Sequence, residues 1–350
     1  MLRFTLGLFI LTVSTLAVFA QSRTDSIAED ILLVQRVNGG WPKHLQIRGK
    51  KEIKTLYDEL NLTDEERETI RRDSAKLNTT YDNNATSKEI RYLIKAYSET
   101  KNTKYLKAAE RGINYILEGQ YDNGGWPQFY PLKGGYADDI TFNDNAMINS
   151  LNVLRDVSTG ENGLDSVDGE LVERCESALA KGIACILKSQ IIIDGELTVW
   201  CAQHDPDTFE ASDARSFELA SLSGQESVGI LRFLMGIENP SPDVIKSIRQ
   251  GMKWIDENKI EGYKTIFPKV PGTERGYDRV LVKEPGAILW ARFYDLETGE
   301  PFFCGRDGVK KASMTEIEYE RRVGYGWYGT WPLKLLTQDY PEWKNKHDLD

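Results

Sequence analysis

The chain has 350 residues, a formal net charge of −10 and 10% aromatic residues. An acidic chain of this kind argues against nucleic acid as a partner, because phosphate backbones bind basic surfaces. The length allows one large domain or two small ones. We expect one domain, since no stretch has the composition of a flexible linker.

The first 20 residues are typical of a secretory signal. Arg3 precedes an apolar run from Phe4 to Ala17, and Ala20 ends a small-residue cleavage pattern. An uncleaved membrane anchor is the alternative. No later segment is apolar for long enough to span a bilayer. We therefore expect residues 1–20 to be removed and residues 21–350 to form one soluble catalytic domain, secreted or periplasmic.

Three stretches repeat one pattern, in which Ile-Leu, two further residues and Gln are followed by a turn that carries Trp. A repeat of this length predicts helical hairpins packed side by side, because one unit cannot bury its apolar face alone. Similar loops then lie at one end, where a site can be assembled. The copies run from Ile31 to Trp41, from Ile116 to Trp126 and from Ile186 to Trp200.

The segments around these turns have helical spacing. Apolar and small residues recur every three or four positions in residues 105–116 and 171–186, and the glycines among them allow close packing. Ser223-Gly-Gln-Glu226 has the pattern of a capping box at a helix start. The second helices of the hairpins are predicted at 86–97, 144–157 and 223–235.

Two segments depart from this pattern. Residues 47–79 form a charged insert, for which we predict a helical excursion at the rim. Residues 258–282 are richer in Gly, Pro and β-branched residues, which favours short strands. The whole chain therefore predicts an all-α dominated fold of helical hairpins with a few short strands.

The four cysteines do not form a dense disulfide framework. Cys175 and Cys185 lie about 15 Å apart along one predicted helix, too far to bridge each other. A Cys201–Cys304 disulfide remains possible, but buried free thiols are favoured. No CxxC motif or His-rich pair indicates a zinc or redox site.

Two near-copies of one polar motif open adjacent predicted helices. They are Thr80–Ala85, which contains Asp82, and Thr141–Ala146, which contains Asn143 and Asp144. Hard cations prefer oxygen ligands, so carboxylates beside amide carbonyls suit Ca²⁺. The alternative is that these residues only cap helices. Two copies in register favour the metal site, although their spacing is not that of an EF-hand.

Arginines follow in the later repeats. Arg215 lies in Asp213-Ala-Arg-Ser-Phe-Glu218, at the corresponding place in the third repeat, and Arg306 lies in a glycine-rich turn. A guanidinium can bind a carboxylate through two hydrogen bonds. A surface salt bridge is the alternative for each arginine, and spacing alone does not exclude it.

The repeated Trp residues and His204 are ambiguous as well. Trp41, Trp126 and Trp200 could bind sugar faces or anchor the hairpins, and the Gly-Gly-Trp-Pro turns favour the structural role. Residues 325–331 are rich in aromatic side chains, and these could likewise form a sugar platform or belong to the core. A lone histidine such as His204 is more often structural.

These motifs together resemble the family 10 polysaccharide lyases, the secreted bacterial pectate lyases. The resemblance covers residues 26–337. Each motif is weak alone, but six in this order are specific. They are Asn38–Pro42, Asp122–Gln128, Ile140–Asp144, Val199–Asp205, Ala214–Leu219 with Ser221–Gly224, and Phe303–Arg306.

The resemblance implies an (α/α)₃ toroid with a cleft at one end, where Ca²⁺ bridges enzyme and substrate. It places the metal and substrate-carboxylate contacts at Asp82 and Asp144, the catalytic base at Arg215 and a substrate-carboxylate clamp at Arg306. We further predict substrate contacts for the residues Asn143, His204 and Trp126.

The implied reaction is β-elimination on α-1,4-linked galacturonate, with polygalacturonate as partner and a monomeric enzyme. An arginine base needs a lowered pKa, which we expect from the nearby Ca²⁺ and Arg306. The alternatives are a glycoside hydrolase using Asp82 and Asp144 as an acid/base pair, and a non-catalytic glycan-binding protein. Endo or exo action, subsite number, tolerance of methyl esters and Ca²⁺ affinity are not encoded in recognisable motifs.

Overall fold

The structure is a computed structural model that describes residues 24–45, 53–54, 57 and 60–349. The predicted signal, residues 1–20, lies outside the described residues, as does part of the charged insert. Helices dominate. They are α1 (Ser26–Val34), α2 (Asp64–Arg72), α3 (Ser87–Thr100), α4 (Thr103–Glu118), α5 (Ala146–Thr159), α6 (Gly169–Ser189), α7 (Glu226–Met235), α8 (Pro242–Glu257), α9 (Tyr319–Gly324) and α10 (Tyr340–Lys346).

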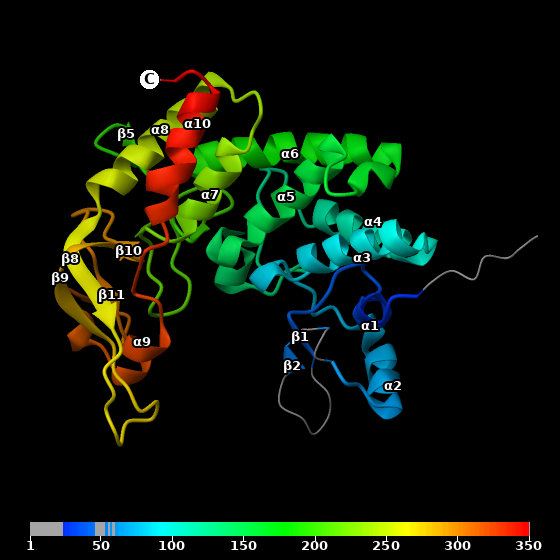
Figure 1. Cartoon of the computed structure of the whole chain (residues 1–350), viewed down its shortest axis with the longest axis horizontal. Helices are drawn as coiled ribbons and strands as arrows, with labels where there is room; N and C mark the ends of the chain where they lie inside the picture. The colour runs from blue at the N-terminus through cyan, green and yellow to red at the C-terminus, as the bar shows by residue number, and fades with distance from the viewer. Residues whose placement is uncertain (1–23, 46–52, 55–56, 58–59, 350) are drawn as a thin grey trace, which may run out of the picture.

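Two rows of helices form the body of the molecule. In one row α3, α5 and α7 pack in succession, and in the other α4, α6 and α8 do the same. The rows are joined by the pairs α3–α4, α5–α6 and α7–α8. In Figure 1 they extend from α1 and α2 to a far end that carries α10 and the longer strands. The predicted helical hairpins are therefore confirmed.

The repeated Gln and Trp build the hairpin joints. Each Gln side chain donates one hydrogen bond to its own turn and one to the neighbouring helix, for example from Gln120 Nε2 to Gly124 O (3.0 Å) and Ala178 O (2.9 Å). Each indole donates to the carbonyl of the repeated Ile. These bonds join Trp41 to Ile31 (2.8 Å), Trp126 to Ile116 (2.7 Å) and Trp200 to Ile186 (2.8 Å).

A fourth copy of this joint escaped the sequence pattern. Trp290 donates its indole hydrogen bond to Ile255 O at 2.8 Å, as in the other three copies. Lys259 stands where the others have Gln, and a long hairpin separates Ile255 from Trp290. The insertion hides the repeat because sequence spacing no longer reflects spatial neighbours.

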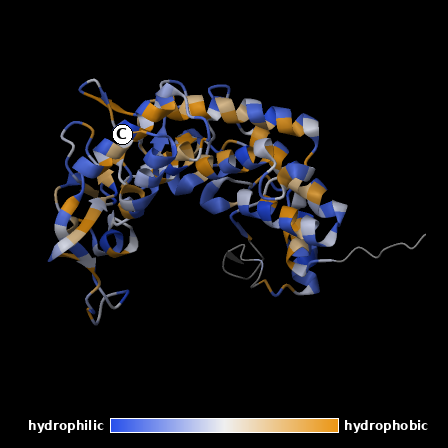
Figure 2. Ribbon diagram, turned by 45° about the horizontal axis from the view of Figure 1, so that its top comes forward, coloured by the Kyte–Doolittle hydropathy of each residue, from blue (hydrophilic) through white to orange (hydrophobic). Residues whose placement is uncertain are grey.

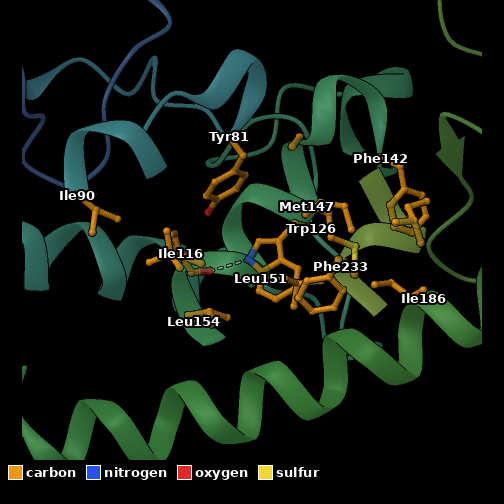
Figure 3. Packing of buried hydrophobic residues seen from close by; sticks show 14 of the residues in the cluster. Tyr81, Ile90, Ile116, Trp126, Phe142, Met147, Leu151, Leu154, Ile186 and Phe233 are labelled. Carbon is orange, nitrogen blue, oxygen red and sulfur yellow. Dashed lines mark hydrogen bonds between the residues drawn. The ribbon is translucent and has the colours of Figure 1, made fainter. Parts of the chain in front are cut away.

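Small residues let the helices approach these Trp rings, as predicted. A Cβ at Gly182 would lie 2.4 Å from Leu151 Cδ2, and one at Gly112 would lie 2.8 Å from Trp41 Cζ3. Figure 3 shows Trp126 in the core beside Leu151 and Phe233, with its bond to Ile116 dashed. Figure 2 shows hydrophobic and hydrophilic residues alternating along the helices, as amphipathic packing requires.

The strands are mostly two-residue pairs that join successive loops. β3 pairs with β6 and β7 with β10, so the loops of neighbouring repeats are joined by backbone hydrogen bonds. The strands are β1 (His44–Leu45), β2 (Ile53–Lys54), β3 (Ile140–Thr141), β4 (Ile192–Ile193), β5 (Glu196–Leu197), β6 (Gln203–His204), β7 (Leu222–Ser223), β8 (Ile260–Ile266), β9 (Val280–Ala291), β10 (Phe293–Tyr294), β11 (Phe303–Cys304), β12 (Lys310–Lys311) and β13 (Tyr328–Gly329).

The structure tests three further predictions. β8 and β9 form the main hairpin, so strands occur where residues 258–282 predicted them. The charged insert contains α2, which confirms its helical character. All four cysteines are buried free thiols, and no Cys201–Cys304 disulfide forms. Among the described residues, none of the helices is both long and apolar enough to cross a membrane.

Candidate active site

The two near-copied motifs form equivalent turns, η3 (Asp82–Asn84) and η5 (Asn143–Asn145), which contact each other. Both turns contain residues in the left-handed backbone region, with φ of 51° at Asn83 and 49° at Asp144. Asn and Asp adopt this conformation more readily than other non-glycine residues. The turn geometry therefore favours these residue types, and it also directs their oxygens toward one place.

One amide joins the two predicted metal-binding carboxylates. Asn83 Nδ2 donates to Asp82 Oδ1 at 2.7 Å and to Asp144 Oδ2 at 3.3 Å. Asn143 Nδ2 donates to the same Asp144 oxygen at 3.2 Å. Lys43 Nζ lies 2.7 Å from Asp82 Oδ2 and neutralises that carboxylate. Residues 61 positions apart in the chain are thus brought together as predicted.

A buried ion pair lies directly behind this cluster. Arg292 donates from Nη2 to Glu226 Oε1 at 2.6 Å, with side chains only 9% and 2% exposed. Glu226 Oε2 accepts from the Asp144 backbone N–H at 3.2 Å, and Arg292 also reaches Asn143 Oδ1 at 3.3 Å. Burial raises the pKa of Glu226 to about 7, with Arg292 opposing the shift and Asp144 adding to it.

The sequence interpretation missed both members of this pair. Glu226 was interpreted as part of a capping box, but its side chain reaches Arg292 and the Asp144 N–H instead. A usable signal existed in the repeat. Arg292 follows Trp290 by two positions, as Lys43 follows Trp41, and both cations pair with a carboxylate of the cluster.

Arg215 is held by a carboxylate in the free protein. Its Nε and Nη2 donate to Glu218 Oε2 and Oε1, both at 2.6 Å, and Tyr325 Oη donates to Glu218 Oε1 at 2.6 Å. The hydrogen bonds that Arg215 donates to Glu218 raise the pKa of Arg215 above its usual range. The sequence did not reveal Glu218 as a partner. The lowering expected from Ca²⁺ and Arg306 concerns the site with its metal bound and stays a prediction.

Arg306 lies beside Arg215 across one aromatic ring. The guanidinium carbons of Arg215, Arg306 and Arg321 lie 4.8, 5.8 and 4.5 Å from the centre of the Phe217 ring. Arg306 donates twice to Glu320, at 3.1 Å each, and Arg321 also pairs with Glu320. The structure therefore gathers three arginines at one place, whereas the sequence motifs indicated two.

A contiguous series of contacts links the arginines to the carboxylates. Arg292 is paired with Glu226 and lies 4.7 Å from the Tyr325 ring centre, and the Tyr325 hydroxyl bonds Glu218, the partner of Arg215. Next to the acidic end lies an open groove of about 580 Å³, lined by Asn83, Asp144, Glu226 and Trp331 among others. Trp331 is half-buried there, whereas Trp327 is in the core, so the core role is confirmed for Trp327 and the sugar platform stays a prediction for Trp331.

The pectic acid lyase family matches residues 35–336 of the chain. The chain belongs to this family. A family 10 polysaccharide lyase from Cellvibrio cellulosa is 34% identical, with a TM-score of 0.76, 90% of this chain covered and 91% of the other. A mutant of that enzyme in complex with trigalacturonic acid is 35% identical, with a TM-score of 0.78 and coverages of 90% and 92%. A comparison with curated proteins gives no match.

These findings confirm the resemblance inferred from the motifs, and with it the helical toroid and the activity class. The protein is a pectate lyase by family. The family match spans the segments that carry Arg215, Arg306 and the two acidic turns. The roles of individual side chains in this lyase rest on the geometry described above.

Two of the predicted substrate contacts need correction. Trp126 is fully buried and its only donor is bonded to Ile116 O, so no sugar can reach it. His204 is also fully buried. Its Nε2 accepts from the Cys201 N–H at 3.0 Å and its Nδ1 lies 2.9 Å from Phe209 O. Burial lowers the pKa of His204 to about 4, so the ring is neutral and structural in the lyase.

The donor set fits a hard cation held in part by substrate. Among the described residues, no group of three or more His, Cys, Asp or Glu side chains forms a ready-made metal centre. Asp82 and Asp144 supply carboxylate oxygens from two adjacent turns, which is the chemistry Ca²⁺ prefers, and Asn83 and Asn143 bond these oxygens through Nδ2 in the free protein. Two carboxylates leave most coordination positions to other oxygens, and a uronate could provide them.

Proposed function

We propose that this lyase cleaves α-1,4-linked polygalacturonate by β-elimination, with Arg215 as the base and with Ca²⁺ bound through Asp82 and Asp144. The observation that carries the proposal is the series of contacts that runs from the acidic turns beside the groove through Arg292 and Tyr325 to the partner of Arg215. The trigalacturonic acid bound by the Cellvibrio relative supports the substrate class. The products would be 4,5-unsaturated oligogalacturonides.

The chemistry requires removal of the C5 proton next to a carboxylate, which is weakly acidic. When bound, Ca²⁺ would neutralise the uronate and act as a Lewis acid. Arg306, which faces Phe217 beside Arg215, is placed to fork onto a substrate carboxylate once it leaves Glu320. With Arg215 in its neutral form, the C5 proton passes to it, the electrons of the C5–H bond form the C4–C5 double bond, and the C4–O4 bond breaks. The leaving oxygen takes a proton from water, and the hydroxide formed removes the proton from Arg215 again.

Arg215 must change its partner before it can act. In the free enzyme two hydrogen bonds to Glu218 hold the guanidinium charged. A substrate carboxylate that displaces Glu218 would release Arg215 toward the sugar, and the Tyr325 hydroxyl remains to bind Glu218. Because a neutral guanidine is scarce near pH 7, activity should rise into the alkaline range. A rate profile that peaks at acid pH would contradict an arginine base.

The test follows the ultraviolet absorbance of the unsaturated uronide with polygalacturonate, with and without EDTA. Activity should be lost with the chelator and restored by Ca²⁺. Arg215→Ala should lower kcat by at least about a hundredfold, the contribution of a general base. Arg174→Ala, an exposed arginine on α6, is the matched control. Wild-type rates in Arg215→Ala would remove Arg215 from the mechanism.

The same assay separates the alternatives. A glycoside hydrolase using Asp82 and Asp144 would shorten the polymer without creating a double bond. A glycan-binding protein would not shorten it, and the buried Trp41, Trp126 and Trp200 offer no platform for one. We also propose a preference for de-esterified polymer, since methyl esters remove the charges that Ca²⁺ and the arginines bind. Faster cleavage of heavily methylated pectin would contradict this.

The remaining proposals concern the whole chain. We propose that residues 1–20 are a cleaved signal, that residues 21–350 act as one catalytic domain, and that the enzyme is a secreted or periplasmic monomer. N-terminal sequencing of protein recovered from medium or periplasm, together with its mass in solution, tests all three. An intact Met1 on the exported protein would contradict signal cleavage.

A further inference from the structure

A second cavity lies away from the catalytic groove, between β8, β9 and the segment after β13. Its volume is about 490 Å³, and its lining includes Thr265, Phe267, Arg279 and Tyr328. The two cavities share no described lining residue. Both border the segment 328–333, because Trp331 lines the catalytic groove while Tyr328 and Leu333 line the second cavity.

Arg279 carries a charge without a hydrogen-bonding partner in this cavity. Its Nε and Nη1 atoms are buried, and no described residue accepts a hydrogen bond from either. The carboxylates nearby in the chain are paired elsewhere. Asp278 binds Arg322 in two hydrogen bonds of 2.8 and 2.9 Å, and Glu284 lies 3.1 Å from Lys264.

Burying the Arg279 nitrogen atoms without hydrogen-bond acceptors costs free energy of folding unless another group accepts those bonds. A buried guanidinium without an acceptor loses hydration and gains nothing in return. Burial lowers the pKa of Arg279, and neighbouring Arg275 adds to that shift. The Thr265 hydroxyl, which lines the same cavity, is also buried without a described partner. Both residues line one space that can hold a ligand, although these particular atoms are covered by neighbouring protein atoms in the free protein.

The other walls indicate what kind of ligand fits. Phe267 is 54% exposed, and its ring centre lies 5.1 Å from the Arg279 guanidinium carbon. Tyr263 and Tyr328 add further aromatic surface. An aromatic face packs against the apolar face of a pyranose, while a guanidinium binds a carboxylate. An acidic sugar therefore matches a wall that carries Arg279 beside exposed aromatic rings.

We propose that the cavity formed by Thr265, Phe267, Arg279 and Tyr328 is an accessory binding site for an acidic sugar, a uronate unit of a polymer. That this polymer is polygalacturonate rests on the proposed function. The site lies outside the catalytic groove and holds the chain by the carboxylate of one residue. The site would keep a long polymer attached to the enzyme between cleavage events. A short oligomer could not reach both sites, so its binding would gain nothing.

The experiment measures retardation of the full-length mature enzyme in native gels containing de-esterified polygalacturonate and EDTA. The chelator prevents cleavage and removes any contribution from Ca²⁺. Arg279→Gln should bind the polymer roughly tenfold more weakly than wild type, the loss expected for one charge-assisted contact. Arg275→Gln removes the same charge from an exposed position on the same hairpin and should be retarded like wild type. Equal retardation of the two variants would overturn the proposal.

Further arms test the ligand and the fold. A gel of neutral galactan should not retard the wild type, and equal retardation there would show that no carboxylate is recognised. Excess acetate should leave the retardation in place, since loss of binding would assign the site to small carboxylates. Arg279→Gln should unfold at the wild-type temperature or higher, because no folded-state hydrogen bond from Nε or Nη1 is removed. A clear drop would make Arg279 structural and overturn the site.

The outcome is separable from that of the proposed function. If the wild type forms no unsaturated product, the lyase mechanism fails while the gel result stands. If product forms but Arg279→Gln and Arg275→Gln bind alike, only the accessory site fails. For the polymer, Arg279→Gln should raise KM with little change in kcat, whereas a residue that acts in the reaction would lower kcat.

Discussion

Replacing Arg292 by Met should destabilise the protein in a pH-dependent way. The variant keeps the length of the side chain but leaves Glu226, only 2% exposed, without its cation. Removing one partner of a buried ion pair typically costs about 3–5 kcal/mol, because the remaining charge stays buried. The cost should appear only where Glu226 is ionised in the folded protein.

The pKa of Glu226 defines that window. Its folded pKa is about 7 and the ordinary value is 4.5, so ionisation already costs the native state roughly 3 kcal/mol above pH 7. A raised folded pKa means that stability is present below pH 4.5 and is lost as pH rises through 7. Arg292 opposes this shift, so its removal raises the pKa further. The variant can keep Glu226 protonated at pH 8, so it forgoes only the roughly 1.4 kcal/mol that the wild type gains from ionisation one unit above its pKa. We expect a loss of about 2 kcal/mol at pH 8 and of about 1 kcal/mol at pH 5, where Glu226 is neutral in both proteins.

Urea denaturation followed by circular dichroism at pH 5 and pH 8 measures both values. Arg292→Met/Glu226→Gln should recover most of the loss at pH 8, since no charge is then left buried. Arg232→Met is the control, because Arg232 pairs with Asp339 at the surface and should cost less than about 1 kcal/mol at either pH. An equal loss at both pH values, or no recovery in the double variant, would refute the reasoning.

Three other predictions concern buried groups and the base. Burial raises the pKa of Glu89 to about 7, so Glu89→Gln should stabilise the protein above pH 7 by roughly 3 kcal/mol and have little effect near pH 4.5, as measured by urea denaturation. Trp126→Ala should cost about 3–5 kcal/mol in the same assay, because it empties a core position and removes the bond to Ile116, while KM per folded enzyme stays unchanged. Glu218→Gln removes the carboxylate that raises the pKa of Arg215, so the alkaline rise of kcat should move to lower pH, and an unmoved pH–rate profile would exclude Glu218 as the controlling partner.

Local features of the chain were sufficient to predict the framework. Helical spacing depends on residues within one or two turns, so α4 and α6 were predicted close to their observed bounds. The repeated Gln and Trp indicated hairpin joints because each copy forms the same short-range bonds. The family motifs then predicted that Arg215, Arg306 and the two acidic turns share one site. The structure brings the two acidic turns together, and it brings Arg215 and Arg306 together on Phe217.

Partners across the fold could not be predicted in this way. Arg292 and Glu226 are 66 positions apart, and Tyr325 reaches Glu218 over 107 positions. Nothing in the local sequence distinguishes these residues from surface charges. The sequence therefore did not indicate that Glu218 raises the pKa of Arg215 in the free protein. The fourth Trp joint was hidden by the hairpin inserted before Trp290.

Sequence alone thus determined the helices, their repeat and the enzyme family, because periodicity and motifs are written in consecutive residues. Burial is different, since it depends on which segments cover a side chain. Only the tertiary structure decided that Trp126 and His204 are enclosed, that Glu218 restrains Arg215, and that Arg279 is left unsatisfied in a second cavity.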